Sequence, residues 1–152
     1  MIVIKIFLGY DHQGLKCKKD IMNYLNENGY LVEVPPILNS DTDDYPDFAK
    51  WVCNKVLSEH SLGILVCGSG IGMSIAANKV RGIKCARVCD GNDAFTAKNH
   101  NGVNVIAFSS NLPVKEIHNI IDNFIMTKEA SEERHLRRIA KVNEIEEEYY
   151  GS

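Results

Sequence analysis

The fold is decided by residues 62–80, which run LGILVCGSGIGMSIAANKV. Positions 62–66 are apolar or glycine throughout, as in a parallel strand that helices cover on both faces. Gly68, Gly70 and Gly72 follow the strand, and a helix is predicted over about 71–80. In sheets built from such units, ligands bind beyond the carboxyl ends of the strands. The loop after this strand is therefore the first candidate for a functional site.

Strand and helix patterns alternate along the rest of the chain. Apolar, β-branched runs predict further strands at 3–8, 31–34, 83–89 and 103–108. Helically spaced apolar residues predict the other helices over about 14–28, 46–57, 92–99, 113–125 and 131–148. This order predicts an α/β fold, with a Rossmann-like, doubly wound sheet of five parallel strands in three α/β/α layers and an extended C-terminal helix. Residues 1–152 are expected to form a single domain.

The last predicted helix, over about 131–148, carries a narrow apolar stripe. Its large apolar side chains recur at every third position and are Leu136, Ile139, Val142 and Ile145. A stripe of this kind is normally buried against another element. The parent sheet and a neighbouring subunit are both open as its partner.

Composition and charge limit the class of protein. Hydrophobic residues make up 45% and charged residues 24% of the chain, as in an ordinary soluble globular protein. The formal net charge of −3 gives no general attraction to nucleic acid or to anionic membranes. No apolar run reaches the roughly 18 residues of a membrane span, and Met1–Gly9 is too short for a signal peptide. No nucleic-acid or membrane partner is expected.

The five cysteines are scattered along the sequence, at positions 17, 53, 67, 85 and 89. Their odd number and irregular spacing argue against a disulfide framework. No C-x-x-C pair is present, so a zinc site is not expected either. Reduced thiols and a cytoplasmic location are the resulting expectation.

The glycine loop by itself is either a tight turn or a cradle of N–H groups for an anion. The dinucleotide fingerprint needs glycine where Met73 stands, and a Walker loop needs a lysine before Lys79. Asp90, after the next predicted strand, stands where a ribose-binding acid would be. A non-catalytic Rossmann-type module that binds a nucleotide or another anion therefore stays open as an alternative.

Cys67 is the distinctive residue of this loop. It ends a predicted strand just before a helix start, where N–H dipoles favour the thiolate. A thiolate there can transfer a proton, although a buried structural cysteine is the simpler interpretation. Arg134 and Arg138 are one helical turn apart and suit a dianion clamp. Other polar residues near predicted strand ends are Asp11, His12, His100, Asn101 and Asn111.

The segments that contain these residues resemble the ribose-5-phosphate isomerase B family, which includes galactose-6-phosphate isomerase subunits. The resemblance covers nearly the whole chain, and its most specific segment is CGSGIGMSIAANK at 67–79. The other similar segments are GYDHQG at 9–14, TDDYP at 42–46, and short pieces at 82–83, 100–101, 104–105 and 134–135.

The resemblance implies an aldose–ketose isomerase of the pentose phosphate pathway. Its reaction would interconvert D-ribose 5-phosphate and D-ribulose 5-phosphate through a cis-enediolate, without a metal or another cofactor. A hexose phosphate, such as galactose or allose 6-phosphate, stays open as the substrate. The resemblance also implies a homodimer, sometimes paired into a tetramer, whose active site is shared between subunits and reached by the C-terminal helix.

The resemblance assigns the chemical steps to particular residues. Cys67 is the base that removes the proton next to the carbonyl, because the following helix carries no acid to replace it. Ser69 and the loop N–H groups hold the enediolate. His100 opens the sugar ring with the help of Asp11. The loop residues that contact substrate are Gly68, Ser69, Gly70, Ile71 and Gly72.

The resemblance also assigns the substrate-binding groups. His12, Arg134 and Arg138 hold the phosphate, while Tyr45 and Asn101 line the pocket. Asn111 counts among the substrate-binding positions, but it stands where the family often has an arginine on the phosphate. Arg137 and Lys98 are the candidates to replace that missing charge.

Overall fold

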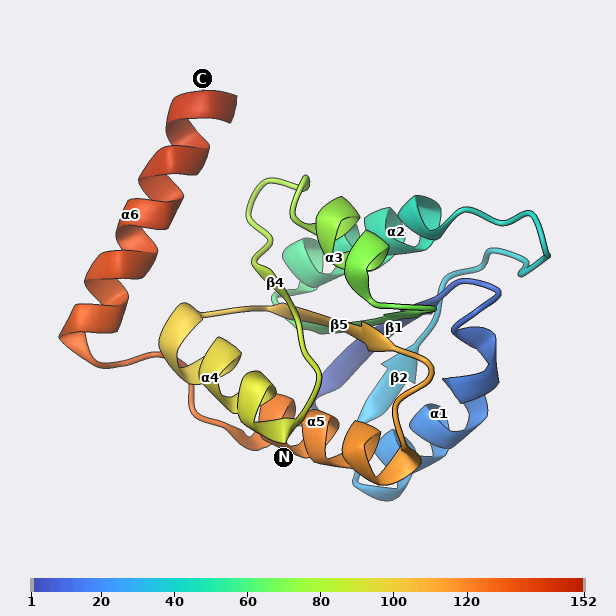
Figure 1. Cartoon of the computed structure of the whole chain (residues 1–152). Helices are drawn as coiled ribbons and strands as arrows, with labels where there is room; N and C mark the ends of the chain where they lie inside the picture. Colours follow the sequence, from blue (N-terminus) through green and yellow to red (C-terminus); the bar gives the residue numbers. More distant parts are fainter. Residues whose placement is uncertain (1, 152) are drawn as a thin grey trace.

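The computed structural model describes residues 2–151, which form one five-stranded parallel sheet with helices on both faces (Figure 1). The strands lie in the order β2-β1-β3-β5-β4. Their bounds are β1 Lys5–Tyr10, β2 Leu31–Glu33, β3 Leu62–Cys67, β4 Cys85–Arg87 and β5 Val105–Ser109. The predicted doubly wound α/β sheet is confirmed.

Each strand is followed in the chain by a helix or a helical turn that packs against the sheet. The helices are α1 Lys18–Glu27, α2 Tyr45–Glu59, α3 Ile71–Ala77, α4 Gly91–Asn101, α5 Val114–Met126 and α6 Glu133–Tyr150. Helices α2 and α3 cover one face, and α1, α4 and α5 cover the other (Figure 1). No helix within residues 2–151 has the length and apolarity needed to cross a membrane.

The chain has two hydrophobic cores, one on each face of the sheet, because side chains alternate along each strand. Successive side chains of a strand point to opposite faces, so Leu65 packs with α2 and α3 while Ile64 and Val66 pack with α1, α4 and α5. All three side chains are fully buried. A strand of this kind must be apolar at every position, as 62–66 is.

The pairing register brings the carboxyl ends of three strands together. Tyr10 at the end of β1 pairs with Val66, and Cys67 at the end of β3 pairs with Ser109. The chain adds β2 on one side of β1 and β3 on the other, so the direction of winding reverses between β1 and β3. Open α/β sheets bind ligands at such a switch point.

Some predicted bounds differ from those in the structure. The strand predicted over 83–89 is limited to Cys85–Arg87, and the helix predicted over 14–28 begins as a 3₁₀ turn at Leu15–Cys17. The helix predicted to end at residue 99 continues to Asn101, because Gly102 ends it with a left-handed φ of 65°. His100 therefore lies in the last turn of a helix.

The C-terminal helix α6 projects from the body (Figure 1). Side chains of its C-terminal half bind the loop at 81–82. The N–H of Gly82 donates to both carboxylate oxygens of Glu146, and Arg81 pairs with Glu147. The apolar stripe partly faces a groove of about 730 Å³ beside edge strand β4. Leu136, Val142 and Ile145 nevertheless stay 47%, 52% and 57% exposed. The parent sheet thus covers the stripe only in part.

Candidate active site

The glycine loop packs closely over the end of β5. Gly70 has a φ of 79°, in the left-handed region that favours glycine. A Cβ at this position would lie 2.8 Å from the Cα of Phe108, so no larger residue fits. The close approach aims the N–H of Gly70 back at Cys67, and the distance from N to Sγ is 3.1 Å.

Cys67 is buried at the last position of β3, and all five cysteines are free thiols. An N–H donated to sulfur stabilises the negative charge of a thiolate. Ser69 is held on both sides, because its Oγ accepts the N–H of Ile71 at 3.2 Å and its carbonyl accepts Nε of Arg87 at 2.9 Å. The hydroxyl hydrogen of Ser69 stays available to a ligand oxygen.

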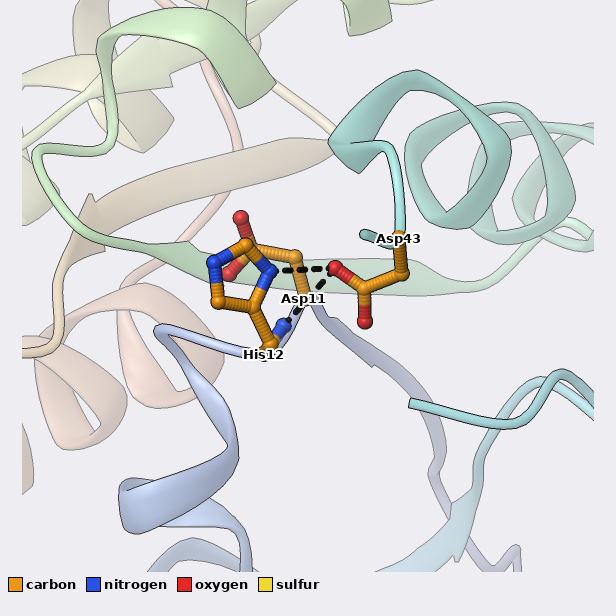
Figure 2. A group of neighbouring side chains, drawn as sticks. All are labelled: Asp11, His12 and Asp43. Atoms are coloured by element: carbon orange, nitrogen blue, oxygen red, sulfur yellow. Dashed lines mark hydrogen bonds and ion pairs between the residues drawn. The ribbon is translucent and has the colours of Figure 1, made fainter. Parts of the chain in front are cut away.

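Asp11 and His12 follow β1 and lie beside the loop. Asp11 is buried, and one of its carboxylate oxygens accepts the N–H groups of Gln13 and Gly14 at 3.0 and 2.9 Å. The ring Nδ1 of His12 lies 2.6 Å from a carboxylate oxygen of Asp43 (Figure 2). This hydrogen bond raises the pKa of His12 above its ordinary value and outweighs the opposing effect of desolvation.

Asn111 lies just beyond β5 and is linked to both neighbouring segments. Its N–H donates to Oγ of Ser109 at 3.0 Å, and that hydroxyl donates to the carbonyl of Gly68 at 2.7 Å. Its side-chain oxygen accepts Nζ of Lys16 at 2.5 Å. An ammonium group therefore stands at this rim of the loop. Lys16 was not among the predicted site residues, and its only signal in the sequence is its place four residues after His12.

Lys98, one candidate to replace the charge missing at Asn111, is not placed to do so. Its side chain is buried, and Nζ donates to the carbonyl of Phe124 at 2.6 Å. Arg137 pairs with Glu133 on the surface of α6, with a distance of 3.2 Å between nitrogen and oxygen.

Tyr45, the first residue of α2, reaches the loop across Gly72. A Cβ on Gly72 would lie 2.7 Å from the Tyr45 ring, so this glycine makes room for the aromatic side chain. Asp11, His12, Tyr45, Cys67, Ser69 and Asn111, with the loop glycines, form what we call the strand-end cluster. Its members lie at or just after the carboxyl ends of β1, β3 and β5 and at the start of α2.

A second group lies at the other end of the sheet. Helix α4 returns from the end of β4 toward the start of β5, so its last turn lies at the amino ends of the strands. There the ring of His100 stacks on that of His135, with centroids 4.3 Å apart. Burial, with a smaller effect of His100, lowers the pKa of His135. We call His100, Asn101, His135 and Arg138, which line the groove under α6, the helix-end cluster.

The structure therefore divides the predicted site residues between two clusters. One chain places Cys67 and His100 at opposite ends of its sheet. Arg134 lies near the helix-end cluster on α6, and its Nε donates to Glu132 at 3.1 Å. The carboxylate of Asp90, considered above as a ribose ligand, instead caps α4 by accepting the N–H of Asp93 at 2.7 Å.

A parallel α/β sheet with a thiol, N–H donors and an imidazole at its strand ends defines an enzyme suited to acid–base chemistry on a small anion. Comparison with known proteins identifies the enzyme family. The model of a family described as Ribose/Galactose Isomerase matches residues 6–142. This chain belongs to that family, as the resemblance predicted.

Individual relatives match over almost their full length. A Mycoplasma genitalium protein named "Probable ribose-5-phosphate isomerase B" is 40% identical over 147 residues, 94% of this chain and 96% of its own. Ribose-5-phosphate isomerase B of Escherichia coli is 35% identical, over 94% and 97% of the two chains. The crystal structure of the M. genitalium enzyme with bound ribulose-5-phosphate aligns with a TM-score of 0.89 and 38% identity, over 97% and 99% of the chains.

Proposed function

We propose that this chain, acting as a single domain over 1–152, interconverts D-ribose 5-phosphate and D-ribulose 5-phosphate. The contact that carries the proposal is the N–H of Gly70 on the sulfur of Cys67, at 3.1 Å, inside a loop rich in N–H groups. The relatives named as ribose-5-phosphate isomerases support the choice of substrate.

The reaction moves one proton between neighbouring carbons. The thiolate of Cys67 takes the proton from C2 of the open-chain aldose, and negative charge develops on the carbonyl oxygen. The hydroxyl of Ser69 and the N–H groups between Gly68 and Gly72 stabilise the resulting cis-enediolate, because preorganised donors act most strongly on charge that appears during the reaction. The thiol then returns the proton to C1, while a second acid–base group moves the hydroxyl proton between O2 and O1.

His100 is the proposed second acid–base group and also opens the sugar ring. Because it lies far from Cys67 in its own chain, we propose a homodimer in which the helix-end cluster of one subunit completes the strand-end cluster of the other. Asp11 assists ring opening from the strand end. The exposed apolar stripe of α6 supports an interface of this kind. Two such dimers can pair into a tetramer.

Cations from both clusters hold the phosphate. His12 and Lys16 stand beside the loop, and Arg134 and Arg138 reach it from the partner subunit. Lys16 then supplies the charge that is missing at Asn111. Tyr45 and Asn101 bind the sugar hydroxyls. The five free thiols support a reducing, cytoplasmic setting.

Solvent-proton exchange into substrate is the decisive test. Wild-type protein should incorporate deuterium at the exchanging carbon, and Cys67→Ala should lose this activity by orders of magnitude with its fold intact. Cys89→Ala is the matched control, because Cys89 is exposed and outside the strand-end cluster. Full exchange by Cys67→Ala would disprove the assignment of the base.

A hexose phosphate is the second candidate substrate, since the family description names galactose beside ribose. Turnover of ribose 5-phosphate, allose 6-phosphate and galactose 6-phosphate under the same conditions separates these candidates. We expect the highest kcat/KM with ribose 5-phosphate. If none of the three is converted, the isomerase proposal fails.

A further inference from the structure

Asp43 lies in the loop between β2 and α2, and its side chain is only 6% exposed. One of its carboxylate oxygens accepts two hydrogen bonds from His12, from the backbone N–H at 3.1 Å and from ring Nδ1 at 2.6 Å (Figure 2). The other accepts the side-chain amide of Asn39 at 3.1 Å and the N–H of Ser40 at 3.2 Å. A buried carboxylate with this many donors stays ionised. Nothing in the proposed reaction uses it directly.

These contacts determine the protonation and orientation of His12. A carboxylate can only accept hydrogen bonds, so the proton of the shared bond must reside on Nδ1. The ring edge that carries Nε2 is turned away from Asp43 (Figure 2). Three carboxylates, those of Asp43, Asp11 and Asp41, face His12 and favour its charged form. An imidazolium held in this way presents Nε2–H as a fixed cationic donor.

We infer that Asp43 is a positioning residue for anion binding, which holds His12 as an oriented imidazolium so that its Nε2–H can donate to the substrate phosphate. This inference rests on the proposed function for the identity of the anion. Asp43 itself does not touch the substrate and acts only through His12.

The two oxygens of the Asp43 carboxylate bind different groups, so substitutions can separate their roles. The oxygen that accepts from Asn39 and Ser40 anchors the loop, whereas the oxygen that accepts from His12 orients the ring. Asp43→Asn removes the charge at nearly constant volume. Asp41→Asn removes the same charge from the same loop, but Asp41 is exposed and makes no hydrogen bond to His12. Asn39→Ala disturbs the anchor and leaves the His12–Asp43 bond in place.

The experiment follows the His12 ring by NMR as a function of pH in the full-length wild type, D43N, D41N and N39A. The signal is assigned by its loss in His12→Gln. D43N should titrate at clearly lower pH than wild type, while D41N and N39A should stay close to it. An unchanged midpoint in D43N would overturn the inference.

Ligand binding completes the test. Inorganic phosphate titrated onto each variant should bind about tenfold more weakly to D43N near pH 7.5, the loss expected for one strong charge-assisted hydrogen bond. With ribose 5-phosphate, KM should rise by a similar factor and kcat should change by less than about threefold. In the H12Q background, D43N should add less than about twofold. Equal phosphate affinity in D43N and wild type would refute the inference. Phosphate bound at His12 without any sugar-phosphate turnover would refute the proposed function and leave the inference intact.

Discussion

The backbone nitrogen of Gly70 lies 3.1 Å from the sulfur of Cys67, and its N–H donates to that sulfur across a sharp turn. The contact requires the left-handed φ of 79° at Gly70 and the absence of a side chain against Phe108. The conformation of one glycine therefore determines where the N–H donor to the sulfur of Cys67 lies.

Gly70→Ala should displace the loop and abolish most activity. The new Cβ would lie 2.8 Å from main-chain atoms of Phe108 and would also strain the left-handed backbone, at a cost of about 1–3 kcal/mol. Steady-state kinetics and thermal unfolding measure the two effects. Gly29→Ala is the matched control, since Gly29 has a φ of 85° and nothing within 4 Å of the added atom. It should cost about 1 kcal/mol of stability and leave kcat/KM unchanged. Equal activity losses in both variants would contradict a specific role for Gly70.

Alkylation of Cys67 should inactivate the enzyme, and substrate should protect it. Cys89 is exposed and should react as well, so the experiment is best made in the Cys89→Ala protein. Iodoacetamide labelling followed by peptide mass spectrometry should show loss of activity in step with modification of Cys67. Complete modification of Cys67 with full activity retained would rule out the thiol as base.

Lys16→Met should raise KM for ribose 5-phosphate by about three- to tenfold at low salt, with little change in kcat. Its ammonium is held at Asn111, and one charge near a dianion at partial exposure is worth about 1 kcal/mol. The effect should shrink as ionic strength rises. Lys19→Met, which removes an exposed lysine of α1, should leave KM unchanged. A similar rise in both variants would indicate only a long-range charge effect.

Mixing Cys67→Ala with His100→Gln should restore activity if the site is shared between subunits. Each variant alone lacks one half of every site. In an equal mixture of exchanging dimers, about a quarter of the sites would combine an intact Cys67 from one chain with an intact His100 from the other. Activity is measured after co-refolding or prolonged incubation. Absence of any recovery, with mixed dimers demonstrated by native mass spectrometry, would exclude the shared site.

The His12–Asp43 pair should make stability depend on pH. The hydrogen bond to Asp43 raises the pKa of His12 in the folded protein above 6.5. Protonated His12 therefore contributes its full stabilisation below about pH 6.5, and this stabilisation is lost as the pH rises through the pKa of His12 in the folded protein. Burial alone would raise the pKa of Asp43, but the bonds from His12, Asn39 and Ser40 outweigh it and lower that pKa below 3.8. The stabilisation that ionised Asp43 contributes is lost as the pH falls through the pKa of Asp43 in the folded protein. The stabilisation is therefore greatest between about pH 4 and 6.5.

Urea unfolding tests the direction in which the unfolding free energy changes with pH. Between about pH 6 and 8.5, wild type should lose more unfolding free energy than Asp43→Asn, because only wild type carries the linked protonation of His12. Asp41→Asn should follow wild type. Parallel pH profiles for wild type and Asp43→Asn would contradict the linkage.

Local patterns in the sequence were sufficient for the strands, the helices and the glycine loop. A run such as 62–66, apolar or glycine at every position, is typical of a strand buried on both faces, and this predicts a parallel sheet without knowledge of its neighbours. The loop at 67–72 was identified for the same reason, because three glycines between a strand and a helix leave few conformations open. Bounds at helix ends were less well predicted, as at Asn101, where a single glycine decides the last turn.

Contacts between residues far apart in the chain were decided only by the tertiary structure. The sequence contains Asp43 and Lys16, but nothing local shows that one meets His12 and the other meets Asn111, 95 positions away. Those contacts depend on strand order and register, which place β1 and β5 on either side of β3. Nor does the sequence show that Cys67 and His100 lie at opposite ends of one sheet.

By itself, then, the sequence determined the α/β fold and the family, because periodicity and a specific loop are properties of short segments. The tertiary structure decided which charged groups stand beside the thiol and which lie too far away within one chain. The physical reason is that α4 runs back against the strands, so a helix that starts at Asp90, beyond the carboxyl end of β4, ends with His100 at the amino ends of the strands. Cys67 and His100, at the two ends of the sheet, can therefore act in one site only if a second chain supplies one of them, as we propose.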